Sequence, residues 1–185
     1  MSGDKTVGGD IRALRNARKM TLEDLARAIG RSLGWVSQVE RGISVPTVAD
    51  LHDIARVLDV PTSLFFGLPG GPAEERGLVV RRAARREIGE RDNGLIEALV
   101  SPDLTDDFEV IHSTFQPGAS LDQDRQRATS EVAYMVSGKL DIWIGGQPFT
   151  VGTGDSFRIK GASYRWANPY PDPACAIWVI SPPVY

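Results

Sequence analysis

Few side chains in this sequence are suited to covalent or metal chemistry. The 185 residues include one cysteine, Cys175, and two histidines, His52 and His112. A single cysteine excludes an internal disulfide and a zinc site built on cysteines. Charged side chains that can form hydrogen bonds and ion pairs are better represented, with 21 Lys and Arg and 24 Asp and Glu residues. What such side chains can do depends on the elements that carry them.

The first third of the chain is predicted to form short helices. Apolar residues recur with helical spacing at 22–29 and again at 48–58. Thr21 and Thr47 each precede one of these stretches with an aspartate three residues later, which is the spacing of a capping box. The predicted helices are 10–18, 21–29, 32–40, 47–58 and a short fifth helix near 63–66.

The rest of the chain has a different pattern. From about residue 78 onward, short apolar or alternating runs are separated by Gly, Pro, Asn and Asp. This pattern favours an antiparallel β-sandwich or barrel. Between the two patterns lies a stretch rich in Gly and Pro, so we predict a helical domain at 1–68, a linker at 69–77 and a β domain at 78–185.

The charges are divided unevenly between these domains. The chain has a formal net charge of −3, with 42% hydrophobic and 24% charged residues, which is typical of a folded protein. Residues 9–45 contain seven basic and four acidic side chains, whereas residues 92–185 contain six basic and twelve acidic ones. We therefore expect the helical domain to approach a polyanion and the β domain to repel one.

Nothing in the sequence predicts a membrane or secretory destination. No apolar run of about 18 residues is present to span a bilayer. Residues 1–10 carry two acidic groups and no apolar core, which argues against a secretory signal. We expect a cytoplasmic protein without a membrane partner.

Residues 9–66 carry several motifs in a fixed order. A helix from Thr21, a tight turn and a second helix from Ser32 would form the geometry that places one helix in the major groove of DNA. The run Ser-Gln-Val-Glu-Arg-Gly at 37–42 follows at the matching spacing. This segment resembles the helix-turn-helix of phage-repressor or XRE-type regulators. The resemblance implies a five-helix, lambda-repressor-like domain that binds double-stranded DNA in a sequence-specific transcriptional regulator.

The same resemblance implies that the helix beginning at Ser32 is the recognition helix. Gln38 can pair bidentately with the edge of an adenine base, whereas Leu33 can offer a base only apolar contact and Gly34 reads nothing directly. Part of the specificity is therefore expected to come from DNA shape and phosphate positioning. A single small domain with so few positive charges should bind DNA weakly, so we expect a homodimer on a two-fold site. By position, Leu33, Gly34 and Gln38 should face base edges, while Ser32, Trp35, Ser37 and Arg41 should lie near phosphates.

The β domain has its own landmarks. They include Pro-Gly-Ala at 117–119, Glu-Val-Ala-Tyr-Met-Val-Ser-Gly at 131–138, Gly-Asp-Ser at 154–156, and Asn168. In this order they resemble a cupin, a small jelly-roll barrel also called a double-stranded β-helix. Behind the helix-turn-helix they resemble regulators that join a DNA-binding head to a cupin sensor. The implied fold class is multidomain, with an α domain followed by an all-β domain.

The cupin resemblance also bears on metals. Enzymatic cupins hold a metal with a His-x-His-x3-Glu set and a further histidine four residues before an asparagine. Here Glu131 occupies the glutamate position, but Arg125 and Arg127 stand at the first two histidine positions and Tyr164 at the third. Because arginine does not ligate a divalent metal, we predict a barrel without metal or other cofactor. A metal-dependent cupin enzyme, such as a dioxygenase or isomerase, is the disfavoured alternative.

Two classes of small effector fit the predicted interior. Arg127 would select a carboxylate, phosphonate or sulfonate through a forked hydrogen bond. Alternatively, Glu131 with Tyr164 and Trp166 resembles the start of an aromatic cage for an amine or quaternary ammonium. A third possibility is that Arg127 and Glu131 pair with each other in a filled barrel that only dimerises. Alternation along the strands predicts the inward-pointing candidates Arg127, Glu131, Met135, Tyr164, Trp166 and Trp178.

Overall fold

The computed structural model describes residues 7–60, 62–66, 73–75, 77–88, 93–102, 104 and 106–184. These residues fall into two compact units, which we call the helical unit and the sheet unit. The helical unit comprises the described residues up to Arg86 together with those of 102–106, and the sheet unit comprises those of 87–101 and 107–184. Of the predicted linker, residues 69–72 and 76 lie outside the described residues.

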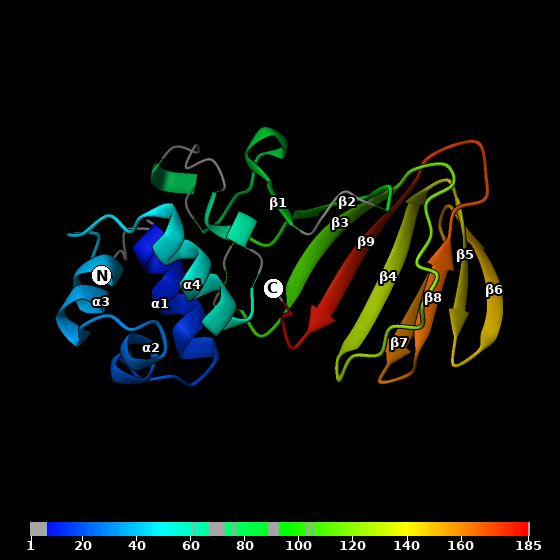
Figure 1. The fold of residues 1–185 in the computed structure, drawn as a ribbon. Helices are drawn as coiled ribbons and strands as arrows, with labels where there is room; N and C mark the ends of the chain where they lie inside the picture. The colour runs from blue at the N-terminus through cyan, green and yellow to red at the C-terminus, as the bar shows by residue number, and fades with distance from the viewer. Residues whose placement is uncertain are drawn as a thin grey trace. The chain divides into compact units, whose positions relative to one another are not determined.

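The described part of the helical unit contains four α-helices (Figure 1). They confirm the first four predicted helices, whereas the predicted fifth helix is wrong, because Thr62–Phe66 forms the 3₁₀ helix η1. Five residues can close little more than one i→i+4 turn, and the tighter 3₁₀ turn is common in such short pieces. The helices are α1 (Val7–Ala17), α2 (Leu22–Ala28), α3 (Leu33–Glu40) and α4 (Val48–Leu58), and two further 3₁₀ turns are η2 (Ala73–Glu75) and η3 (Arg82–Ala84).

Side-chain caps fix where α2 and α4 begin. Thr21 Oγ1 accepts the backbone N–H of Asp24 at 3.1 Å, and the Asp24 carboxylate accepts the N–H of Thr21 at 2.9 Å. Thr47 and Asp50 repeat both bonds at 3.2 and 2.9 Å. These are the two predicted capping boxes, and each satisfies amide donors that the first helical turn leaves free. After α2 the chain turns at Gly30, where φ is +67°, a value that favours glycine.

Close packing against α1 positions α3. A Cβ atom at Gly8 would lie 1.9 Å from the carbonyl oxygen of Val39, so only glycine permits this approach of the two helices. Among the described helices, none is both long and apolar enough to cross a membrane. The side chains buried beneath α3 and its neighbours are Ile11, Leu14, Leu25, Val36, Val39, Leu51, Ile54 and Leu58.

The sheet unit contains a six-stranded and a three-stranded sheet (Figure 1). The order is β1-β2-β3-β9-β4-β7 in the first and β6-β5-β8 in the second, and the pairs from β2 onward are antiparallel. One apolar core draws residues from both sheets, so the sheets pack face to face. The strands are β1 (Arg86–Ile88), β2 (Leu95–Leu99), β3 (Glu109–Phe115), β4 (Ser130–Ser137), β5 (Lys139–Ile144), β6 (Gln147–Gly152), β7 (Ser156–Lys160), β8 (Tyr164–Ala167) and β9 (Ala174–Ser181).

The described residues show a sandwich rather than the predicted closed barrel. No continuous ladder joins the two sheets within the part of the chain that is described. Next to β8, the segment between β3 and β4 forms only isolated bridges, from Ser120 to Ala167 and from Arg125 to Tyr164. This segment, residues 116–129, includes Pro117 and contains no regular strand, so it forms no continuous ladder with β8 that would close the barrel.

Strand register brings distant residues into rows on the inner face of the larger sheet. Ile180 on β9 lies opposite both Glu109 on β3 and Glu131 on β4. The next row joins Ile111, Trp178 and Ala133, and the one after it joins Ser113, Ala176 and Met135. All nine side chains of these rows are buried, as the alternation predicts. Two acidic residues therefore lie in the same row as core positions.

Candidate functional site

Helix α3 has one buried face and one exposed face. Val36 and Val39 are each 1% exposed, and Glu40 is buried beside them. The other face carries two large apolar side chains, of which Leu33 is exposed and Trp35 is half-buried. The seven residues predicted to contact DNA are all exposed or half-buried, namely Ser32, Leu33, Gly34, Trp35, Ser37, Gln38 and Arg41.

Several of these residues have defined local partners. Ser32 Oγ caps α3 by accepting the backbone N–H of Trp35 at 3.2 Å. Leu33 is 52% exposed. Ser44 Oγ donates to Gln38 Oε1 at 3.0 Å, which leaves both amide hydrogens and one lone pair of Gln38 available. Gln38 is thus oriented by a neighbour while its donors remain free for a base edge.

The start of α3 is accessible, and an arginine lies just beyond each end of the helix. A Cβ atom at Gly34 would meet nothing within 4 Å, so the backbone is accessible there. The guanidinium carbon of Arg31 lies 5.0 Å from the centre of the Trp35 ring and its nitrogens bond to Asp50 at 2.6 and 3.0 Å. At the other end of the helix, the side chain of Arg41 is exposed and donates to the Ser37 carbonyl at 3.1 Å.

A buried ion pair holds α3 from behind. Arg15 on α1 donates to both carboxylate oxygens of Glu40, at 2.6 and 3.0 Å, and to the carbonyl of Met20 at 2.7 Å. The hydrogen bond to Glu40 keeps the pKa of Arg15 above its usual value. Such forked bonds fix orientation as well as distance. The pair therefore sets the angle at which the exposed face of α3 is presented.

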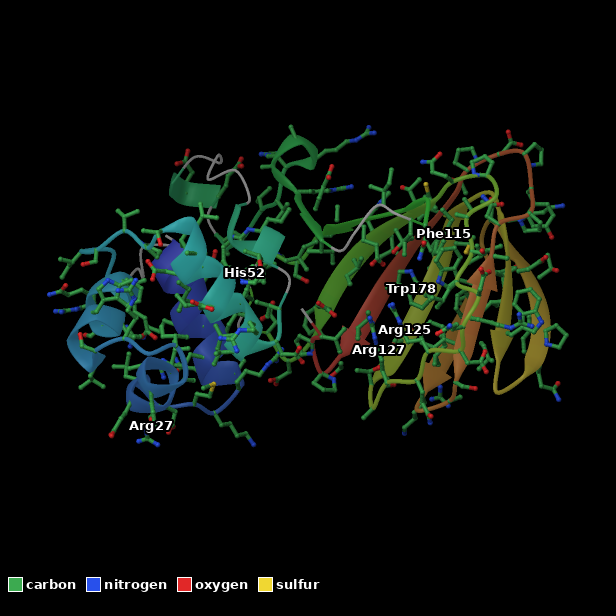
Figure 2. All side chains as sticks on the ribbon, viewed as in Figure 1. Arg27, His52, Phe115, Arg125, Arg127 and Trp178 are labelled. Atoms are coloured by element: carbon green, nitrogen blue, oxygen red, sulfur yellow. The ribbon has the colours of Figure 1, made fainter. Side chains whose placement is uncertain are left out.

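The inward-pointing residues predicted for the cupin-like part lie between the two sheets. Glu131, Met135, Tyr164, Trp166 and Trp178 are at most 6% exposed. Arg127 is half-buried, and Figure 2 shows it with Trp178 in the region of β9 and β4.

These predicted residues do not form one cluster. Met135 and Trp166 are part of the packed core, where the Trp166 ring lies edge-on to Phe115 with centroids 4.7 Å apart. Trp178 makes a similar contact with Phe157 at 5.3 Å. By contrast, burial raises the pKa of Tyr164, and the charges of Arg127, Glu131, Arg125 and Glu97 also act on it, so these groups lie within electrostatic range of Tyr164.

Arg127 and Glu131 do not pair with each other. Among the described residues, Arg127 forms no hydrogen bond or ion pair, and Glu131 accepts only the hydroxyl of Thr129 at 2.6 Å. The possibility that these two residues fill the interior as a salt bridge is therefore wrong. Arg125, the other arginine at a predicted histidine position, has an exposed side chain and pairs with Tyr164 through the backbone, with both N–O distances at 2.8 Å.

The structure adds two carboxylates that the sequence reasoning missed. Glu97 on β2 is half-buried and accepts the hydroxyl of Ser113 at 2.9 Å. Glu109 on β3 is fully buried, and its Oε1 accepts the backbone N–H of Val184 at 3.0 Å. Glu109 Oε2 is also buried but has no hydrogen-bond partner among the described residues. A signal was present, because Glu109 shares the alternation phase of the core residues of β3.

Burial perturbs the acid strength of these groups. Desolvation raises the pKa of Glu109 to about 7, although the bond from Val184 and the charge of Arg127 lower it. Desolvation also raises the pKa of Glu97, although the hydrogen bond from Ser113 and the charges of Arg127 and Arg125 lower it. The charge of Glu131 raises both pKa values further. Glu97, Glu109, Arg127, Glu131 and Tyr164 thus form one electrostatically coupled group, which we call the interior charge cluster.

Metal chemistry finds no support in the geometry of this cluster. Within the described residues, no three His, Cys, Asp or Glu side chains are grouped so that they could hold a metal ion. Asn168, a landmark of the sequence pattern, has a structural role instead, since its amide donates to the carbonyls of Phe115 and Asp172 at 2.9 and 3.0 Å. The cluster can offer charge and hydrogen bonds to an organic molecule.

Comparison with known proteins finds a domain-family match in each unit of the chain. Residues 7–65 match the helix-turn-helix domain family, and residues 111–180 match the cupin domain family. The chain is 29% identical over 150 residues to the HTH-type transcriptional regulator SutR of Escherichia coli K12, a match that covers 80% of this chain and 79% of the relative. It is 23% identical over 165 residues to the HTH-type transcriptional regulator PuuR of the same organism, covering 87% and 86%.

A solved structure supports the fold of the sheet unit. An RmlC-like cupin from Shewanella frigidimarina matches with a TM-score of 0.50 and 18% sequence identity, covering 57% of this chain and 91% of that chain. At this level of identity the similarity concerns the fold alone.

Proposed function

We propose that this chain, which joins an XRE-type helix-turn-helix domain to a cupin domain as the sequence predicts, is a DNA-binding transcriptional regulator whose cupin domain senses a small charged molecule. The observation that carries the proposal is the exposed, capped and internally braced face of α3 around Gln38. The regulator acts by binding, without a catalytic step of its own.

The DNA-binding half of the proposal rests on the exposed face of α3. Gln38 offers two free donors and an acceptor, which is the pattern that reads adenine in the major groove. Leu33 offers apolar surface that suits a thymine methyl group. With seven basic and four acidic residues at 9–45, the local charge favours phosphate contact, although weakly for a single copy.

A second copy of the chain is expected to supply the missing affinity, and the outward face of the larger sheet is suited to pair with itself. The outward positions of β3, β9 and β4 carry no charged side chain along the whole of these three described strands. When one face of a sheet meets only water, its outward positions are normally polar and alternate along each strand with inward apolar ones. A two-fold interface places a surface against its own copy, so an uncharged face avoids self-repulsion. Exposed apolar residues on it are Val132, Tyr134, Val136 and Val179, at 44, 51, 45 and 43% exposure.

The sensing half rests on the interior charge cluster. Charged groups without matching partners inside a domain cost free energy unless a ligand satisfies them. A molecule that binds there regulates only if it binds the DNA-competent and DNA-incompetent arrangements with different affinity. Ligand binding and operator binding should therefore alter each other by the same factor.

A DNA-binding assay tests the first half. The preferred site is selected from random duplexes, and fluorescence anisotropy then measures its affinity and that of scrambled DNA. We expect Gln38→Ala to weaken binding to the selected site by about 10- to 100-fold while changing scrambled DNA little, because bidentate base contacts give discrimination. Gln147→Ala, which removes an exposed glutamine of β6 in the sheet unit, is the matched control. Equal losses on both DNAs would contradict base reading by Gln38.

Sedimentation analysis tests the dimer. Tyr134→Lys combined with Val132→Lys places like charges against each other across the proposed two-fold interface, so we expect a shift from dimer to monomer. Phe149→Lys changes an aromatic residue that is 50% exposed on β6 of the other sheet and should leave the dimer intact. A wild-type chain that sediments as a monomer at micromolar concentration would refute this part of the proposal.

A further inference from the structure

The chemistry of the interior charge cluster narrows the class of molecule that the sheet unit binds, an inference that rests on the proposed function. The cluster contains three carboxylates, from Glu97, Glu109 and Glu131. Glu109 and Glu131 are 0% and 2% exposed. Among the described residues, none of the three carboxylates forms an ion pair, and their partners are hydroxyl groups and one backbone N–H. A buried carboxylate normally has a cation in contact.

Arg127, the half-buried cation of the cluster, is equally unmatched. Arg125 also acts on Glu97 and Tyr164 through its charge, but its side chain is exposed. Arg127 influences the pKa values of Glu97, Glu109 and Tyr164 through its charge, so it lies within electrostatic reach of all three groups. It nevertheless donates no hydrogen bond among the described residues. An arginine has five N–H donors in a rigid fork, which suits a carboxylate held bidentately. Opposite charges therefore stand near one another in the interior without touching.

Each simple ligand would satisfy only part of this arrangement. An anion bound to Arg127 would be repelled by the three nearby carboxylates. A cation bound to the carboxylates would leave the Arg127 fork empty and be repelled by it. A metal ion is disfavoured, because no three acidic, His or Cys side chains of the described residues are grouped to hold one.

We propose that the interior charge cluster binds a small zwitterion, a molecule with both an ammonium and a carboxylate group, in the manner of an amino acid. Its carboxylate pairs with the guanidinium of Arg127, and its ammonium is held by Glu109 and Glu131. The ligand lies between groups of opposite charge that the protein itself leaves apart. Both classes of ligand that the sequence suggests, the anion and the amine, are thereby combined in one molecule.

The unpartnered oxygen of Glu109 supports the placement of the ammonium end of the ligand at Glu109 and Glu131. Glu109 Oε2 is buried and lacks a donor among the described residues, while Oε1 is already occupied by Val184. An ammonium group has three N–H donors and can supply that bond together with one to Glu131. A quaternary ammonium has no N–H and would leave Oε2 unsatisfied, so we expect a primary amine to be preferred.

An isomeric series of probes tests the proposal on the full-length protein. Butylamine carries only the ammonium, butyrate only the carboxylate, and α-, β- and γ-aminobutyrate carry both groups on the same four-carbon chain at increasing separation. Thermal-shift measurements and calorimetry give the relative affinities. We expect at least one aminobutyrate isomer to bind about 10-fold or more tightly than either single-charge probe, because it forms charge-assisted bonds at both ends.

Two substitutions test separately how the carboxylate and the ammonium of the ligand are bound. Arg127→Gln should weaken the best isomer about 10- to 100-fold. The same change should leave butylamine binding unweakened or make it tighter, because the repulsion between Arg127 and the bound ammonium is removed. Glu131→Gln should weaken the isomer and butylamine together. Asp172→Asn, which neutralises an exposed carboxylate of the sheet unit, should change neither. Far-UV circular dichroism of each variant checks that it is folded.

The possible failures are distinguishable. If butylamine or butyrate binds as well as every isomer, the zwitterion proposal is overturned while small-molecule sensing stands. If none of the five probes binds, the zwitterion proposal and the sensing half of the proposed function both fail. The DNA-binding half is decided separately by the Gln38 experiment.

Discussion

The two units of this protein treat buried charge in opposite ways. In the helical unit, Arg15 and Glu40 are buried as a forked pair, and Asp50 is bonded to both Arg31 and Thr47. In the sheet unit, Glu109 and Glu131 are more deeply buried but have no cation in contact among the described residues. The pKa of Asp50 is accordingly lowered, chiefly by its hydrogen bond from Thr47, whereas burial raises the pKa of Glu109.

This difference separates charges that build a fold from charges that are available to a ligand. A paired charge fixes the geometry of its neighbours, and in the helical unit that geometry is the angle of α3. An unpaired buried charge contributes nothing to stability and is kept at a cost, so a ligand-binding role is its simplest physical explanation. The three predictions below test this contrast, beginning with the largest expected effect.

Removing one partner of the buried pair should destabilise the helical unit most. Glu40→Ala leaves the Arg15 guanidinium buried with only the Met20 carbonyl as a partner, and we expect a loss of about 3 to 5 kcal/mol in the free energy of unfolding. Urea denaturation followed by far-UV circular dichroism measures it. Arg27→Ala breaks an exposed pair with Glu23 and should cost less than about 1 kcal/mol. Similar losses in the two variants would show that burial is not what distinguishes the Arg15–Glu40 pair.

The sheet unit should lose stability as pH rises toward neutrality. Because the folded pKa of Glu109 is raised to about 7, its proton binds more tightly in the folded state, and that contribution is complete below the unfolded pKa of about 4.5 and lost as pH rises through 7. The expected decline is on the order of 3 kcal/mol. Glu97, Glu131 and Arg127 act on the same group, so part of the slope belongs to the coupled cluster.

Glu109→Gln should remove most of that decline. Urea denaturation at several pH values between 5 and 8, followed by tryptophan fluorescence in a Trp35→Phe background, reports on the sheet unit, which contains the remaining three tryptophans. Asp24 and Asp50 of the helical unit have lowered pKa values, so their contributions are present above about pH 4 and are lost only in more acidic solution. A Gln variant with an unchanged pH profile would contradict the assignment to Glu109.

The smallest expected effect concerns a helix cap. Thr47→Ala removes the hydroxyl that accepts the N–H of Asp50 and donates to its carboxylate. We expect a loss of about 1 kcal/mol from the helical unit, measured by the same denaturation experiment. Thr47→Ser retains the hydroxyl and should restore most of the stability. Failure of serine to do so would indicate that the methyl group of Thr47, rather than the cap, is responsible.

Interactions between residues close in the sequence were predicted more accurately than interactions between distant segments. The capping boxes at Thr21 and Thr47 were predictable because both partners lie within one helical turn. The short fifth helix was predicted wrongly, since apolar spacing over five residues does not distinguish an α-helix from a 3₁₀ turn. The closed barrel was predicted from strand spacing, which says nothing about whether the last ladder forms.

The candidate site shows the same division. Arg127 and Glu131 were found through their place in a motif, although no pattern indicated that they remain apart. Glu109 was missed, despite its alternation phase, because a glutamate on a strand is usually solvated and only the register reveals what covers it.

The sequence by itself determined much of the local structure of this protein: the presence of the four α-helices, the capped starts of α2 and α4, and the inward phase of several strand residues. These follow from relations between residues a few positions apart. Only the tertiary structure decided which charges meet. Arg15 reaches Glu40 across 25 positions to form a pair, while Glu109 and Glu131 lie opposite the same residue, Ile180, with no cation in contact among the described residues. The physical reason is that an electrostatic interaction depends on distance and burial in space, which are fixed by helix packing and strand register rather than by separation along the chain.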